Sequence, residues 1–111
     1  MEGGRGDAGP NPYELLLASL GSCTSMTLEL YARRKKWPLE GVVVRLAHSK
    51  IYADDCAECD TKVGMLDRIE CGIELKGPLS EEQKSRLLEM SEKCPIHRTL
   101  MSEIDIRSRL V

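Results

Sequence analysis

The sequence predicts an α+β fold in which one long helix lies against an antiparallel sheet. Two observations lead to this prediction. Residues 15–36, LLLASLGSCTSMTLELYARRKK, place apolar side chains at helical spacing. Residues 42–53 and 68–77 are instead rich in β-branched side chains and partly alternate, as strands do. The expected order is one helix, two strands, two helices and a final strand.

Length and composition limit the size and the partners of this fold. The 111 residues are enough for one domain. The chain has no Phe and one Trp, so its core must be built from Leu, Ile, Val and Met, and a dimer would help to complete it. A net charge of −2 and few aromatic residues are not typical of nucleic-acid-binding proteins, so no nucleic-acid partner is expected.

Two further features concern the compartment. No apolar run approaches the roughly 18–20 residues that span a membrane, and the start does not resemble a signal peptide. Five cysteines, an odd number, fit a reducing compartment better than a secreted disulfide framework. We therefore expect a cytoplasmic protein with no membrane partner.

The domain is expected to span residues 10–111. Residues 1–9, MEGGRGDAG, are glycine-rich and aperiodic, which predicts a flexible lead-in. Asn11 can cap the first helix, Pro12 suits its first position, and Glu14 complements the positive end of the helix dipole. One helical face is expected to be buried, widened by Leu17, Leu28 and Tyr31. It comprises Leu16, Leu20, Cys23, Thr27 and Leu30.

The remaining elements follow from local patterns. Residues 42–53 and 68–77 should pair as an antiparallel hairpin with a long loop at its tip. Ser80 and Gln83 form a capping-box pattern that begins a helix. Pro95 marks the first position of another helix. Residues 104–111, IDIRSRLV, alternate and predict a last strand that can join the edge of the hairpin.

Cys94 is the first candidate functional residue. It should lie at a helix N-terminus, where unpaired N–H groups and a partial positive charge favour a thiolate. His97 and Arg98 follow three and four residues later, on the same helical face. This is a suitable setting for a reactive sulfur, although the same pattern also fits a capping residue followed by two exposed side chains.

Cys23 presents the opposite case. It lies in the middle of the long helix, where the helix dipole gives no help, and its neighbours Ser22 and Thr24 carry no charge. Burial among leucines would raise the pKa of its thiol and make it inert. Periodicity alone therefore favours a packing role, and activation would need a cation from elsewhere in the fold or from a second subunit.

Three further cysteines allow other interpretations. Cys56 and Cys59 form a C-x-x-C pair in the loop, and Cys71 and His48 lie on the flanking strands. These four side chains could ligate zinc, but a second close pair is missing. The C-x-x-C pair could also be redox-active, although it does not follow a strand and open a helix. Loop thiols without a fixed role, with Cys71 packed in the core, are the simplest interpretation.

Two long segments together resemble a known family. GPNPYELLLASLGSCTSMTLELYARRKKWPLEGV, followed some seventy residues after Cys23 by KCPIHRTL, is similar to the OsmC/Ohr family of osmotically inducible protein C and organic hydroperoxide resistance proteins. The anchors are NP twelve residues before a helical SC and CP opening a later helix. The loop DDCAECDTKVGMLDRIE resembles a less studied OsmC-like branch.

The resemblance implies an intertwined homodimer with active sites at the subunit interface and thiol-dependent reduction of organic hydroperoxides. Cys23 matches the peroxidatic cysteine and Cys94 the resolving one. The implied cycle passes through a sulfenic acid and a disulfide and is reset by an external dithiol reductant. It needs no metal or other cofactor, because sulfur carries both electrons.

The chain departs from the family pattern at two points. The family's thiolate-stabilising arginine lies on an N-terminal strand without a counterpart here, so Arg98 is a candidate substitute. The acidic partner of that arginine falls at Tyr13, one position before Glu14, so Glu14 is the candidate that could take its place by a small shift. Two alternatives to a peroxidase therefore stay open. One is a metal-binding or redox-sensing module using Cys56 and Cys59, and the other is a non-catalytic OsmC-like dimer.

Overall fold

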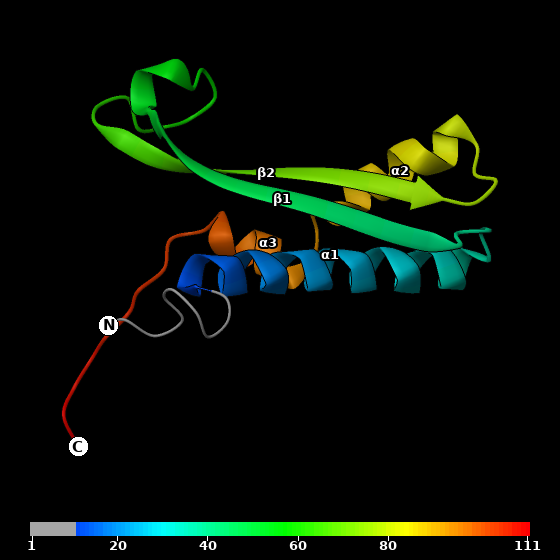
Figure 1. Cartoon of the computed structure of the whole chain (residues 1–111), viewed down its shortest axis with the longest axis horizontal. Helices are drawn as coiled ribbons and strands as arrows, with labels where there is room; N and C mark the ends of the chain where they lie inside the picture. Colours follow the sequence, from blue (N-terminus) through cyan, green and yellow to red (C-terminus); the bar gives the residue numbers. More distant parts are fainter. Residues whose placement is uncertain (1–10) are drawn as a thin grey trace.

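The computed structural model describes residues 11–111, and the lead-in expected at residues 1–9 lies outside them. The chain forms the predicted α+β fold, with a long helix lying along an antiparallel hairpin (Figure 1). The elements, in order, are α1 (Pro12–Lys35), β1 (Gly41–Tyr52), the short 3-10 helix η1 (Ala53–Asp55), β2 (Met65–Lys76), α2 (Glu81–Ser91) and α3 (Pro95–Leu100).

Helix α1 begins and ends as its local sequence predicts. The Asn11 side chain accepts the Glu14 backbone N–H at 2.8 Å, and the Glu14 carboxylate accepts the Asn11 N–H at 2.9 Å. This capping box satisfies two backbone donors that a helix start leaves free. At the other end Lys36 adopts a left-handed conformation with φ 61°, which turns the chain before Pro38.

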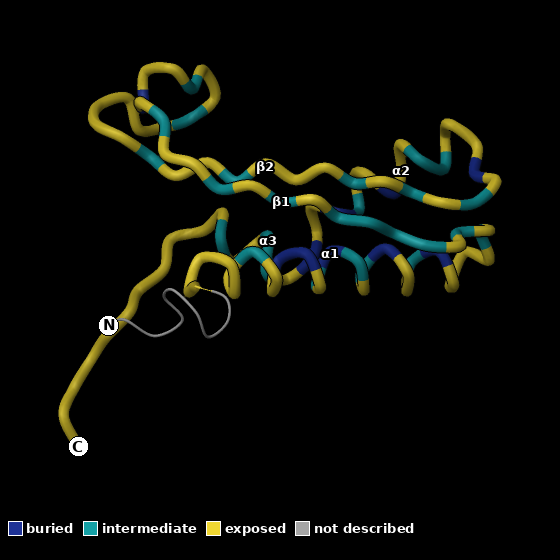
Figure 2. The backbone as a smooth tube through the Cα atoms, in the orientation of Figure 1, coloured by how far each residue is buried: buried dark blue, intermediate teal, exposed yellow. Residues whose placement is uncertain are grey.

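The predicted buried face of α1 is confirmed at Leu20 and Leu28, but elsewhere the buried face is rotated about the helix axis. The buried residues are Leu20, Gly21, Thr24, Leu28 and Ala32. Cys23 and Thr27 are only half-buried, and Leu30 is 52% exposed. Two other apolar residues of α1, Leu15 and Met26, are 57% and 58% exposed. The physical reason is Gly21, which lets the helix approach β1 so closely that a Cβ there would lie 2.8 Å from Leu46 Cδ1. Figure 2 shows the resulting alternation of buried and exposed positions along α1.

The apolar character of α1 is greater than expected, since no stretch of the sequence was expected to be long and apolar enough to span a membrane. Helix Pro12–Lys35 is long and apolar enough to pass a length-and-composition test for a membrane span. Core helices pass the same test. In this fold one side of α1 packs on the hairpin, and its other side carries the exposed apolar residues described above.

The hydrophobic core lies at the open end of the hairpin. Its buried centre consists of Leu28 and Ala32 of α1, Leu87 of α2, and Leu79 before α2. Tyr31 joins the two helices, because its hydroxyl accepts the Arg86 Nε–H at 3.0 Å. Around this centre pack the half-buried side chains of Tyr31, Trp37, Leu39, Val42, Ile73, Leu75 and Met90. Helix α2 starts with the predicted Ser80–Gln83 capping box.

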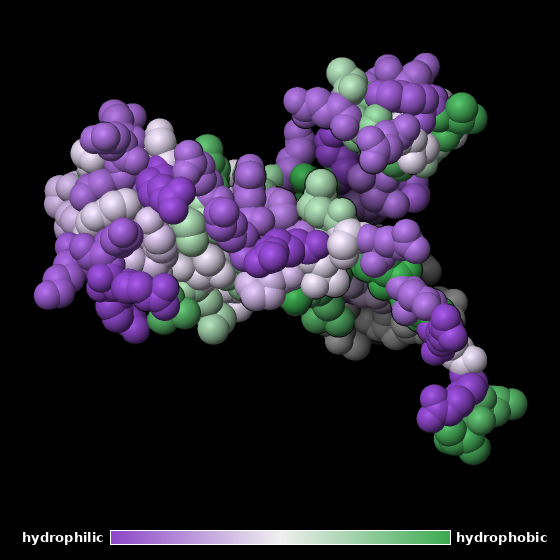
Figure 3. All heavy atoms as spheres, turned by 180° about the vertical axis from the view of Figure 1, so that it is seen from behind, coloured by the Kyte–Doolittle hydropathy of each residue, from purple (hydrophilic) through white to green (hydrophobic). Residues whose placement is uncertain are grey.

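The predicted final strand is not present. Residues 104–111 have no strand assignment, and they run away from the hairpin (Figure 1). Ile106 is 84% exposed, and Leu110 and Val111 at the end of this segment are fully exposed (Figure 3). Alternation makes a segment fit to be a strand, but a strand forms only where a free sheet edge lies beside it. Within the described residues the sheet therefore has two strands.

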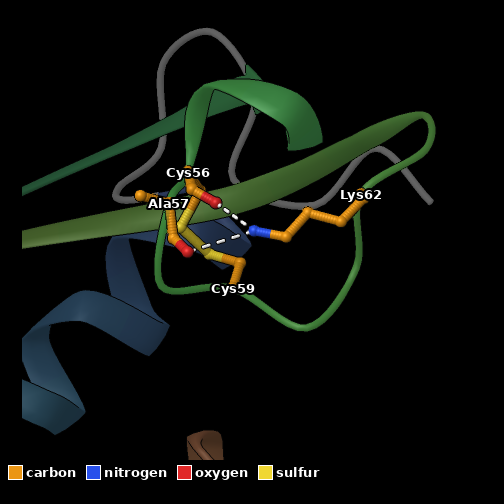
Figure 4. Close-up of a disulfide and its surroundings, with 4 residues drawn as sticks. All are labelled: Cys56, Ala57, Cys59 and Lys62. Atoms are coloured by element: carbon orange, nitrogen blue, oxygen red, sulfur yellow. Dashed lines mark hydrogen bonds between the residues drawn. A yellow bond between two sulfur atoms is a disulfide. The ribbon is translucent and has the colours of Figure 1, made fainter.

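The hairpin tip is closed by a covalent bond. Cys56 and Cys59 form a disulfide (Figure 4). Lys62 Nζ donates to the carbonyl oxygens of Cys56 at 2.8 Å and Ala57 at 3.2 Å, so the lysine holds the same turn. The interpretation of these two cysteines as loop thiols without a fixed role is therefore wrong. Spacing alone did not distinguish pairing from zinc binding or free thiols.

Gly77 provides a test of the contact between the hairpin and the turn before β1. Its φ is +122°, and a Cβ there would overlap the carbonyl oxygen of Pro38. We expect Gly77→Ala to lower the free energy of unfolding by at least about 2 kcal/mol. Gly64→Ala is the matched control, since Gly64 also has positive φ, +85°, but open space around it. Equal losses for the two variants in urea unfolding would contradict this packing.

The disulfide gives a second test of the fold. Replacing Cys56 and Cys59 by serine should release the tip, with faster backbone amide exchange in residues 53–64 and unchanged exchange in α1. The chain-entropy estimate for such a small loop is about 2 kcal/mol of stability. Hydrogen–deuterium exchange followed by mass spectrometry measures both segments. Unchanged exchange at the tip would mean that the Lys62 hydrogen bonds alone hold it.

Candidate functional site

Cys94 occupies the predicted position at the start of α3. It is the N-cap residue, with Pro95 in the first turn, and its Sγ accepts the backbone N–H of His97 at 3.3 Å. The side chain is fully buried and lies 3.8 Å from the Thr24 hydroxyl of α1. The sulfur is therefore fixed by one contact within α3 and by one contact with α1.

Cys23 lies on the side of α1 that the hairpin does not cover. It is half-buried and lines a shallow hollow of about 390 Å³ formed by α1 and the start of α3. The lining residues are Ser19, Ser22, Cys23, Met26, Thr27, Leu30, Pro95 and Ile96. The expectation that leucines bury this thiol is thus replaced by a thiol at the edge of a mainly apolar surface.

The fold brings the two predicted catalytic cysteines to the same contact between helices. Cys94 touches Thr24, the residue after Cys23, and Pro95, the residue after Cys94, lines the hollow at Cys23. Both thiols are free. Cys23 and Cys94 therefore flank the α1–α3 contact, with Cys94 on its buried side.

The predicted supporting residues have separate positions. Glu14 forms the capping box of α1. Arg98 is exposed on α3, one turn after Cys94. His97 is half-buried and lines a groove between α1, the hairpin and α3. The His97 backbone N–H donates to the Cys94 sulfur, and the Arg98 backbone N–H donates to the Cys94 carbonyl oxygen at 3.0 Å.

This groove has a volume of about 380 Å³ and was not predicted from the sequence. Most of its walls are apolar. They are formed by Tyr13, Leu16, Leu20, His48, Asp67, Ile69, Cys71, His97, Leu100 and Met101. Because α1, β1, β2 and α3 each contribute residues, only the packed fold reveals it.

A polar cluster lies at one end of the groove. Asp67 Oδ1 is 2.8 Å from His48 Nε2 and 2.9 Å from Lys50 Nζ, and the Tyr13 ring stacks on His48 with centroids 4.8 Å apart. The hydrogen bonds from His48 and then Lys50 lower the pKa of the Asp67 carboxyl, and the bond to Asp67 raises the pKa of Lys50. The hairpin register, which places Lys50 opposite Asp67, is the signal that could have identified this pair.

The structure does not assemble the four side chains considered for zinc. Cys56 and Cys59 are joined in a disulfide, and a disulfide offers no thiolate to a metal. His48 and Cys71 line the groove, and the prediction that Cys71 packs in the core is wrong, because Cys71 is exposed at the groove wall. Among residues 11–111 no group of three or more His, Cys, Asp or Glu side chains is placed to hold a metal ion.

Comparison with known proteins places this fold. The family model described as OsmC-like protein matches residues 4–109. An OsmC-like protein from Mycoplasma pneumoniae is 26% identical, with a TM-score of 0.66 over 84% of this chain and 63% of its own. An OsmC-like hydroperoxide resistance protein from a Jannaschia species is 25% identical, with a TM-score of 0.71 over 96% and 70%.

A more distant structure shares the fold at lower identity. The organic hydroperoxide resistance protein OhrB of Bacillus subtilis is 20% identical, with a TM-score of 0.64 over 89% of this chain and 68% of its own. This chain thus spans about two thirds of the length of each of these proteins. No curated protein is significantly similar to it in sequence. Since the family model covers residues 4–109, the chain belongs to the OsmC-like protein family.

Proposed function

We propose that this protein is a thiol-dependent peroxidase that reduces organic hydroperoxides with Cys23 and Cys94. The observation that carries the proposal is the placement of two free thiols on either side of the α1–α3 contact, with Cys23 at an apolar hollow. An apolar surface suits the organic part of such a substrate. The names of the Jannaschia and Bacillus proteins, both hydroperoxide resistance proteins, support the same chemistry.

The cycle uses the two sulfurs in turn. The Cys23 thiolate attacks the terminal oxygen of the hydroperoxide, the O–O bond breaks, and the alkoxide leaves and is protonated to an alcohol. Cys23 is then a sulfenic acid. The Cys94 thiol attacks that sulfur, water leaves, and a Cys23–Cys94 disulfide forms. An external dithiol reduces the disulfide by thiol–disulfide exchange, so no metal or organic cofactor takes part.

Formation of the disulfide requires Cys94 to leave its buried position. Its sulfur contacts Thr24, which is the residue after Cys23 in α1. To reach Cys23, the Cys94 sulfur must move from one side of α1 to the adjacent side. Helix α3 has only six residues, Pro95–Leu100, and is followed by an exposed segment. A small displacement of this helix is therefore the movement that we assign to the resolving step. It also brings Arg98 along, the cation that we propose to support the reacting sulfur.

The peroxidase is tested by counting thiols. The protein has three free thiols, Cys23, Cys71 and Cys94. One equivalent of cumene hydroperoxide should leave one titratable thiol in the unfolded wild type. Cys23→Ser should react negligibly, whereas Cys94→Ser should form a sulfenic acid that dimedone traps. Cys71→Ser, the control, should still lose two thiols.

Two outcomes would contradict the proposal. Unchanged titration in the wild type, with no peroxide consumed in the presence of a strong dithiol, would favour a non-catalytic dimer. Loss of thiols that persists in Cys23→Ser would place the reaction at another cysteine.

We also propose that the active form is a cytoplasmic, intertwined homodimer. The accessible surface of the chain is 8712 Å², whereas a compact monomer of 12.4 kDa has about 6,100 Å². Part of the excess belongs to the extended C-terminal segment. The rest includes the outward side of α1, where Met26 and Leu30, which line the hollow of Cys23, are more than half exposed. A second copy that covers this side would close the site.

The dimer is tested by light scattering after size-exclusion chromatography. The wild type should elute with about twice the 12.4 kDa mass of the chain. Replacing both Met26 and Leu30 by glutamate would bury two charges in the proposed interface, so this variant should be a monomer. Ser85→Glu adds a charge on the exposed side of α2 and should remain dimeric. Equal masses for all three proteins would exclude the outward side of α1 as the interface.

A further inference from the structure

We propose that Cys71 is a second disulfide partner of Cys94 and takes over Cys94 from Cys23 by thiol–disulfide exchange. Cys71 would act as an internal acceptor that releases Cys23 for another turnover. The release of Cys23 rests on the proposed peroxidase function, whereas the pairing of Cys71 with Cys94 does not. The inference comes from three features of the structure around α3.

The first feature is the direction of the Cys71 side chain. Cys71 of β2 pairs with Leu46 of β1 in the antiparallel register. Directly opposed residues of such a pair project from the same face of the sheet. Leu46 packs against Gly21 of α1, so this face looks toward the helix layer. Cys71 therefore lies on the sheet face that looks toward α1, where it remains exposed at the groove.

The second feature is the groove that Cys71 shares with α3. Cys71 and His97 both line it, together with Leu20 of α1. His97 is the residue whose backbone N–H donates to Cys94 Sγ at 3.3 Å. Leu20 lies one helical turn before Thr24, which contacts the same sulfur. Cys71 thus shares the groove with His97, the residue whose backbone holds the buried Cys94 sulfur.

The third feature is an electrostatic link between the two thiols. Cys71 is exposed as a residue, but partial desolvation of its thiol raises the pKa of that thiol, and the charge of a Cys94 thiolate raises the pKa further. A high pKa makes Cys71 a poor direct reductant of peroxide, because little thiolate is present at neutral pH. It also favours a disulfide at Cys71 over a free thiolate. Both effects suit a thiol that accepts a disulfide after the peroxide has reacted elsewhere.

The exchange step is balanced without another reactant. Cys71 loses its proton to solvent, and its thiolate attacks the Cys94 sulfur of the Cys23–Cys94 disulfide. The old S–S bond breaks, a Cys71–Cys94 bond forms, and the electron pair leaves with Cys23 as a thiolate. The protein contains one disulfide from this site before and after the step. Cys23 can then reduce a second hydroperoxide and become a sulfenic acid.

The exchange predicts a stoichiometry. With excess cumene hydroperoxide and no reductant, the wild type should consume two equivalents per chain, and Cys71→Ser should consume one. Dimedone should then label Cys23 in the wild type but not in Cys71→Ser. Peptide mapping should find a Cys71–Cys94 linkage. Equal consumption by the two proteins, or a wild type in which only Cys23–Cys94 is linked, would overturn the exchange.

A second experiment separates this inference from the peroxidase. Diamide oxidises neighbouring thiols without peroxide, so the Cys23→Ser variant treated with diamide should form a Cys71–Cys94 disulfide within one chain. Absence of that linkage, or a linkage only between chains on a non-reducing gel, overturns the pairing whatever the peroxidase does. Formation of the linkage in a protein that consumes no hydroperoxide would leave the pairing in place and refute the peroxidase alone.

Discussion

The close packing of α1 on β1 at Gly21 is the contact on which the rest of the site depends. The missing side chain lets the helix settle against Leu46, and the buried stripe of the helix then continues through Thr24 and Leu28. This orientation turns Cys23 away from the hairpin and places Thr24 against Cys94. One glycine thus decides the side of the helix from which each thiol can be reached.

Features fixed by neighbouring residues followed from the sequence. The Asn11–Glu14 and Ser80–Gln83 caps depend on hydrogen bonds across three residues, and Cys94 lies at a helix start because Pro95 follows it. The rotation of α1 did not follow, because apolar side chains surround most of its circumference and periodicity then selects no single face. Gly21 marks the buried face, because the missing side chain matters only where a strand packs against the helix.

Other features needed tertiary information. The alternation at residues 104–111 indicates that this segment is able to form a strand, but not whether the fold places it beside an edge of the sheet. The Cys56–Cys59 spacing was compatible with metal binding, free thiols or a disulfide, and it became specific only at the tip where Lys62 holds the turn. The cluster at Asp67 required the strand register, which the sequence does not state.

The two tasks that we propose for Cys94 set the energy scale of the proposed redox site. Its sulfur caps α3 through the His97 N–H, and the same sulfur must leave that position to bond with Cys23 or Cys71. Loss of an N-cap costs about 1 kcal/mol, which is small beside the free energy released when a peroxide O–O bond is reduced. A long, well-packed helix would oppose the movement through many contacts. Helix α3 has only six residues, fewer than two turns at about 3.6 residues per turn. The cap is therefore the main interaction within α3 that the proposed oxidation would break. In this proposal the shortness of α3 is what allows one buried sulfur to serve two partners.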